Sequence, residues 1–99
     1  MTENPTASYP LPATLDTSAA GDLRHTLLGR IERGEPLHLD GEDVVRIGQA
    51  CLQVLASARA TAAARGLGFR LHRASDALSR MIALAGLDAA LAPVAASDA

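Results

Sequence analysis

The fold is decided by the stretch VVRIGQACLQVLASARATAAA, which covers residues 44–64. A short β-branched segment passes through Gly48 directly into the most regular helical pattern of the chain, which is typical of a strand or loop that leads to a helix N-terminus. At 100° per residue, one face of this helix carries small and branched apolar side chains: Cys51, Leu55, Ala58 and Ala62, flanked by Leu52 and Val54. We expect this face to be buried.

The opposite face of the same helix is almost uncharged. It carries two amides and two methyl groups, from Gln49, Gln53, Ala56 and Ala60. A solvated helix face usually carries charged side chains instead. This stripe therefore indicates docking against another protein.

The segment before the helix predicts a first strand and a first helix. Pro10 and Pro12 would interrupt a central strand, so we expect a short edge strand at residues 13–15. Asp16 or Thr17 then offers a helix N-cap. Apolar residues follow at helical spacing before Gly34 closes the helix: Ala20, Leu23, Leu27 and Ile31.

Two further strands are predicted by alternation. Residues 36–40 place Leu37 and Leu39 on one side, and residues 69–72 repeat the pattern with Phe69 and Leu71. Alternation indicates a sheet that helices cover on one face only. Gly66 and Gly68 bracket the turn before the second of these strands.

A third helix follows, capped by Ser75 or Asp76 and ended by Gly86. Its inward residues are Leu78, Met81, Ile82 and Ala85, and residues 87–91 add a turn or a short fourth helix. Strands that alternate with helices run parallel with right-handed crossovers. The sequence thus predicts an α/β fold with a small, mainly parallel or mixed sheet and helices packed chiefly on one face.

Length and composition limit the classes of function. The 99 residues suffice for one domain, which we place at residues 9–92 between disordered tails at 1–8 and 93–99. A net charge of −2 and 2% aromatic residues argue against nucleic acid as a partner. Neither a membrane span nor a signal peptide is recognisable, so we expect a cytoplasmic protein without membrane insertion.

Residues that carry chemistry are few. Cys51 lies on the buried helix face, where we expect an inert thiol. If the two alternating strands are neighbours, His38, Asp40 and His72 form a polar cluster, for which a solvated sheet face is the favoured interpretation over catalysis or metal binding. Gly48 alone, without a following Lys, is a weak sign of an anion site. We expect no cofactor, no metal and no catalytic residues.

Two motifs resemble the STAS domain family, the fold of bacterial anti-sigma factor antagonists. The first is Leu11-Pro-Ala-Thr-Leu-Asp16-Thr-Ser-Ala-Ala20, which is similar to the family's strand entering its first helix. The second is Leu37-His-Leu-Asp40 followed by Val44-Val-Arg-Ile-Gly-Gln-Ala-Cys-Leu52, which is similar to the core strand, loop and second helix. The resemblance covers about residues 11–91 and implies a STAS-like fold, although the family's opening strand looks shortened or missing.

The resemblance also implies a site at the start of the second helix. Regulated members begin this helix with Asp-Ser-Ser/Thr-Gly-Leu, and a partner kinase phosphorylates the second hydroxyl. Aligned on Leu52, that degenerate phosphoacceptor position is Ala50, which has no hydroxyl. The departure puts the phosphorylation switch in doubt and leaves a docking surface, which we place at Arg46, Gly48, Gln49, Ala50 and Gln53.

Three functional hypotheses follow. The leading one is a non-catalytic interaction module, anti-sigma factor antagonist-like, in signal transduction or chemotaxis, with a signalling regulator or an anti-sigma/kinase-like protein as partner. The alternative is an MlaB-like accessory subunit of a lipid-transport ABC transporter that docks the transporter ATPase. The third is an enzyme that uses His38, Asp40 and His72. A homodimer through the open sheet face is a further option.

Overall fold

The computed structural model describes residues 8–91, so the tails predicted at residues 1–8 and 93–99 lie outside the described residues except for Ser8. The elements follow one another as β1 (Tyr9–Pro10), β2 (Thr14–Leu15), the 3-10 helix η1 (Thr17–Ala19), α1 (Ala20–Glu32), β3 (Leu37–Asp40), β4 (Arg46–Ile47), α2 (Gln49–Ala64), β5 (Phe69–His72), α3 (Asp76–Leu84) and α4 (Asp88–Leu91).

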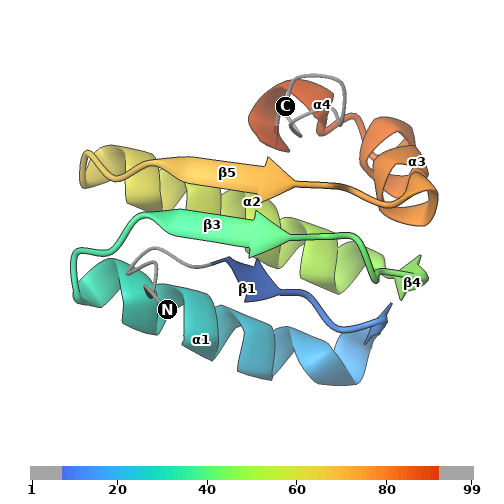
Figure 1. Cartoon of the computed structure of the whole chain (residues 1–99), viewed down its shortest axis with the longest axis horizontal. Helices are drawn as coiled ribbons and strands as arrows, with labels where there is room; N and C mark the ends of the chain where they lie inside the picture. Colours follow the sequence, from blue (N-terminus) through green and yellow to red (C-terminus); the bar gives the residue numbers. More distant parts are fainter. Residues whose placement is uncertain (1–7, 92–99) are drawn as a thin grey trace, which may run out of the picture.

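The main sheet has three parallel strands in the order β1-β3-β5. The register of β3 and β5 pairs Leu37 with Phe69 and Leu39 with Leu71, so that the apolar residues of both strands share one face. Figure 1 shows α1 and α2 behind this sheet, whereas no helix formed by residues 8–91 lies in front of it. The predicted α/β class, with a small parallel sheet and helices chiefly on one face, is confirmed.

The core lies between the sheet and the helices, and it consists of aliphatic side chains. Leu27 of α1, Leu39 of β3 and Leu55 of α2 are each fully buried, and no polar or charged residue among residues 8–91 is buried. The buried face predicted for the second helix is confirmed, since α2 buries Cys51, Leu52, Leu55, Ala58 and Ala62. Alternation at period 2 and period 3.6 therefore predicts most of the interior residues. The third helix is the exception, because Leu78 and Ile82 are buried as predicted, whereas Met81 is half-buried and Ala85 is exposed where the helix ends.

The N-terminal strand prediction needs a correction. Thr14–Leu15 does form a strand, but it pairs with Arg46–Ile47 in a separate two-stranded sheet. The edge of the main sheet is instead Tyr9–Pro10, which the prediction treated as interrupted. Pro10 is tolerated there because an edge strand needs hydrogen bonds on one side only, and Leu11 continues the pairing by donating its N–H to the Asp40 carbonyl at 2.9 Å.

Most helix boundaries agree with the prediction, and one differs. Asp16 caps the 3-10 helix η1 and not α1. As a result, α1 begins only at Ala20. Ser75 caps α3 by accepting the Leu78 N–H. Gly86 follows α3 with a φ of 71°, a left-handed conformation that favours glycine and closes the helix as predicted.

Candidate docking surface at the start of helix α2

The start of helix α2 is fixed by the small β2–β4 sheet. Gly48 donates its N–H to the Leu15 carbonyl at 2.9 Å, and its own carbonyl accepts the Leu52 N–H at 3.1 Å to open the helix. Gly48 is the N-cap, with φ −98° and ψ 175°, and it offers no side-chain cap. This conformation is open to any residue, so glycine is not required here by the backbone.

The structure brings the five predicted docking residues together at this end of α2. Arg46, Gln49 and Gln53 are exposed, and Gly48 and Ala50 are half-buried. No hydrogen bond or ion pair joins the side chains of Arg46, Gln49 or Gln53 to another residue within the described range 8–91. Their polar groups are therefore free to meet a partner without first breaking contacts.

One residue of this surface was missed from the sequence. Val45 is 72% exposed beside Arg46, whereas Val44 is 2% exposed. The signal was present, because only one of two consecutive residues in an extended segment can face the core. An exposed branched apolar side chain next to two amides gives this surface an apolar anchor.

The inner side of the same helix turn is closed. Cys51 is fully buried, and its thiol donates to the Asp16 carbonyl at 3.3 Å, which ties α2 to the start of η1. Burial, and to a lesser extent the nearby Asp16 carboxylate, raise the pKa of the Cys51 thiol. A thiol held neutral and covered is a poor nucleophile, in agreement with the inert role expected for it.

Asp16 itself lies at the edge of the surface, exposed to solvent. Its carboxylate accepts from the Ser18 hydroxyl at 2.7 Å and from the Ala19 N–H at 3.2 Å. These hydrogen bonds, the one from Ser18 first, hold the pKa of Asp16 below its usual value. Asp16 is therefore a structural cap that stays ionised, not a candidate acid.

The loop before β4 is anchored from the other side by the β5–α3 connection. The Ser75 hydroxyl donates to the Val44 carbonyl at 2.6 Å, and the Ser75 N–H donates to the Gly41 carbonyl at 3.1 Å. Arg73 forms ion pairs with Asp40 and Glu42, and it does so from a left-handed backbone with φ 51°. These three anchors hold the segment that presents Val45 and Arg46.

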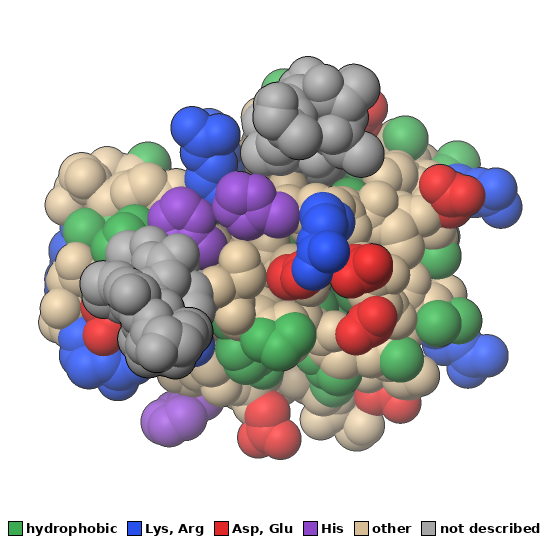
Figure 2. Space-filling model, viewed as in Figure 1, with side chains coloured by type: hydrophobic (Ala, Val, Ile, Leu, Met, Phe, Trp, Pro, Cys, Tyr) green, Lys and Arg blue, Asp and Glu red, His purple; other side chains and the backbone are tan. Residues whose placement is uncertain are grey.

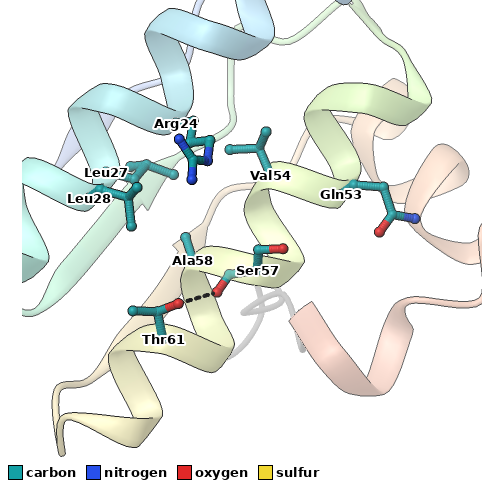
Figure 3. A pocket seen from close by; sticks show the side chains of 8 residues that line it. All are labelled: Arg24, Leu27, Leu28, Gln53, Val54, Ser57, Ala58 and Thr61. Carbon is teal, nitrogen blue, oxygen red and sulfur yellow. Dashed lines mark hydrogen bonds between the residues drawn. The ribbon is translucent and has the colours of Figure 1, made fainter.

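A shallow groove runs along the outer side of the helix layer between α1 and α2 (Figure 3), with a volume of about 230 Å³. Leu27 and Leu28 from α1 face Val54 and Ala58 from α2 across it, and Arg24 lies over its upper end. Gln53 borders the groove but points away from α1 (Figure 3). The groove thus continues the docking surface with an apolar floor.

The polar cluster predicted for the open sheet face is also formed. The Nδ1 of His38 and the Nε2 of His72 lie 3.3 Å apart, and Figure 2 shows two histidines side by side on the face without helices. Burial, and then the charges of His72 and Arg70, lower the pKa of His38. Arg73, which donates to the Asp40 carboxylate, lowers the pKa of that carboxyl. Asp40 is thus engaged by Arg73 and not by an imidazole.

Two kinds of feature are absent from the described part of the chain. Residues 8–91 hold no group of three or more His, Cys, Asp and Glu side chains suited to a metal ion. Within the same residues, none of the helices has the length and apolar character needed to span a bilayer.

Comparison with known proteins identifies the class. The family model described as "Mlab, STAS domain" matches residues 11–93, which is most of the chain. The chain therefore belongs to the STAS domain family, as the two motifs indicated. STAS domains generally mediate protein–protein interactions. No curated protein matches the chain.

Proposed function

We propose that this chain is a non-catalytic STAS module that binds a protein partner through the start of helix α2. The surface consists of Val45, Arg46, Gly48, Gln49, Ala50 and Gln53. The observation that carries the proposal is that this exposed surface is nearly uncharged and has no partners among the described residues. Val45, Gly48 and Ala50 have few or no rotatable side-chain bonds to order, and the amides of Gln49 and Gln53 carry no charge that must be removed from water, so burial of this surface is less costly than burial of a charged helix face.

The phosphoacceptor position supports a constitutive form of binding. Ala50 stands where regulated family members carry a hydroxyl, and it is half-buried at the first turn of α2. A phosphate there would add about two negative charges to the docking surface. Since Ala50 cannot be modified, we infer that a partner kinase does not switch this surface, and that binding is set by competition or scaffolding.

Two classes of partner fit this surface. A signalling regulator, such as an anti-sigma or chemotaxis protein, is one. The other is the ATPase of a lipid-transport ABC transporter, to which this chain would bind as an MlaB-like accessory subunit. The description of the matching family model fits this second class at least as well as the first. Both partners would act in the cytoplasm, which we propose as the compartment of the chain.

The test is an affinity purification from the source organism with the wild type, Ala50→Glu and Ala64→Glu as baits, followed by mass spectrometry. Ala64 is exposed at the end of α2, fourteen residues after Ala50, so it is a matched control about 21 Å along the helix and beyond the residues of the uncharged stripe. We expect a protein that is recovered with the wild type and Ala64→Glu but lost with Ala50→Glu. Its identity separates the two classes, and a partner retained by Ala50→Glu would contradict the proposed surface.

A further inference from the structure

The histidine pair on the open sheet face has an unusual geometry. His38 on β3 and His72 on β5 are diagonal neighbours, since His38 is paired with Arg70 and Asp40 with His72. Their ring planes are within 9° of parallel, their centroids are 5.5 Å apart and their facing nitrogens are 3.3 Å apart. For that nitrogen distance, 5.5 Å is close to the largest centroid separation two imidazoles can have. The two nitrogens therefore lie almost on the line between the rings.

This nitrogen separation matches that of two ligands on one metal ion. Zinc binds imidazole nitrogen at about 2.0–2.1 Å, so two ligands at tetrahedral positions lie roughly 3.3–3.4 Å apart. The pair in the structure is already at this distance, and only a tilt of the two rings is needed to aim both lone pairs at a common point. Both rings are half-buried on adjacent strands, so the fold has already restricted the side chains that would bind.

The charges around the pair permit a cation. Arg70, opposite His38, contributes one positive charge to this face, and Asp40, opposite His72, contributes one negative charge. Asp40 is held by Arg73 and by the Glu42 N–H, so it stays close to the site without being needed as a ligand. Among residues 8–91, no helix lies in front of the pair (Figure 1).

We propose that His38 and His72 form a two-imidazole site for a divalent transition cation of the zinc type, independent of the docking surface on α2. Each ring coordinates through the nitrogen that now faces the other ring. The proton shared between the two facing nitrogens moves to the outer nitrogen of its own ring, so both imidazoles stay neutral. Water completes the coordination, because the protein supplies two ligands.

The experiment uses the untagged full-length chain, Zn²⁺ as the probe, and imidazole nitrogen NMR together with calorimetry. His25, exposed on α1 away from the sheet, provides the matched control. We expect the signals of His38 and His72 to shift together with one Zn²⁺ per chain while that of His25 stays in place. The dissociation constant should rise at least tenfold in His38→Ala and in His72→Ala and stay unchanged in His25→Ala.

The wild-type spectrum decides the proposal even if a histidine variant folds poorly. Shifts of the His38 and His72 signals that saturate at one equivalent of Zn²⁺ support the site. The proposal is overturned if 1 mM Zn²⁺ leaves both signals unchanged, or if His25→Ala loses binding as much as the other two variants do.

Discussion

The open face of the sheet and the start of helix α2 are both exposed, but their polar groups are arranged differently. On the sheet face, His38 contacts His72 and Asp40 pairs with Arg73. On α2, Gln49 and Gln53 have no such contacts within residues 8–91. The first surface is organised by bonds within the chain, whereas the second is available for bonds with a partner. Changes near the first should therefore alter stability, and changes at the second should alter binding.

The largest effect on stability is expected where the sheet meets α3. A β-carbon added at Gly41 would lie 2.5 Å from the Leu78 Cδ2 and 3.4 Å from the Ala74 Cα, and because Leu78 is fully buried, its side chain can move aside only if its neighbours in the core repack. Gly41→Ala should lower the free energy of unfolding by about 1–3 kcal/mol. Urea unfolding, followed by circular dichroism, measures this.

Gly48→Ala is the matched control for Gly41→Ala. Its added β-carbon would find only the Leu15 carbonyl oxygen at 3.9 Å. Alanine caps a helix less well than glycine, but it also lowers the conformational entropy of the unfolded chain. Because these two effects oppose each other, the free energy of unfolding should change by less than about 0.5 kcal/mol. If both variants lost the same free energy of unfolding, the chain around Gly41 would be packed no more tightly than the chain around Gly48, which would contradict the comparison of the two surfaces.

The next effect concerns the left-handed residue Arg73. Arg73→Ala and Arg73→Gly both remove the ion pairs to Asp40 and Glu42, so the loss of these pairs is the same in the two variants. Only the glycine variant also relieves the left-handed backbone with its φ of 51°. Arg73→Gly should therefore be more stable than Arg73→Ala by about 1 kcal/mol. The reverse order in thermal unfolding would show that the backbone here is not strained.

Stability should also fall on acidification, because of the histidine pair. The folded state lowers the pKa of His38, so between that value and the unfolded value of about 6.5 the unfolded chain binds more protons. The His38 contribution is fully present above about pH 6.5, and it is lost as the pH falls from there through the lower pKa of the folded state. Unfolding of the wild type at pH 7.5 and 5.5 should show this loss, and His38→Ala should show less of it. Identical losses would exclude His38 as the source.

The smallest effect is expected at the cap of α2. Gly48 leaves the first N–H groups of the helix without a side-chain acceptor. Gly48→Ser supplies one and should raise the free energy of unfolding by a few tenths of a kcal/mol. Differential scanning calorimetry detects this as a small rise in the melting temperature. A decrease would indicate that the N-cap geometry tolerates no side chain.

The helices and the central strands could be predicted because their signal is periodic. Alternation around Leu39 and Leu71 and helical spacing through Leu55 are direct consequences of which side chains face the core. The edge strand at Tyr9–Pro10 has only two residues, which are too few to show an alternation of apolar and polar side chains. It can be recognised only from its pairing with β3 in the structure. Because of the prolines in that segment, the prediction found the strand at Thr14–Leu15 and missed the one at Tyr9–Pro10.

The exposure of the proposed docking residues could be predicted from the sequence, except for Val45. Helical periodicity places Gln49 and Gln53 outside, and consecutive positions imply that only one of Val44 and Val45 faces the core, but which one does so depends on how Ser75 holds the carbonyl of Val44. That contact joins residues 31 positions apart, and no local pattern reports it. The contact between His38 and His72 likewise required the register of β3 and β5, which the sequence alone leaves open.

The central claim is that binding occurs at the start of α2, and one set of dissociation constants tests it directly. The partner recovered with the wild type is titrated, by calorimetry, with the wild type, Gln49→Glu and the pair variant His38→Ala/His72→Ala. A charge buried without a partner at an interface costs about 2 kcal/mol or more, so Gln49→Glu should bind about thirtyfold more weakly at an unchanged melting temperature. The histidine variant should bind like the wild type. Wild-type affinity of Gln49→Glu together with loss of binding in the histidine variant would contradict the account and move the docking surface to the open face of the sheet.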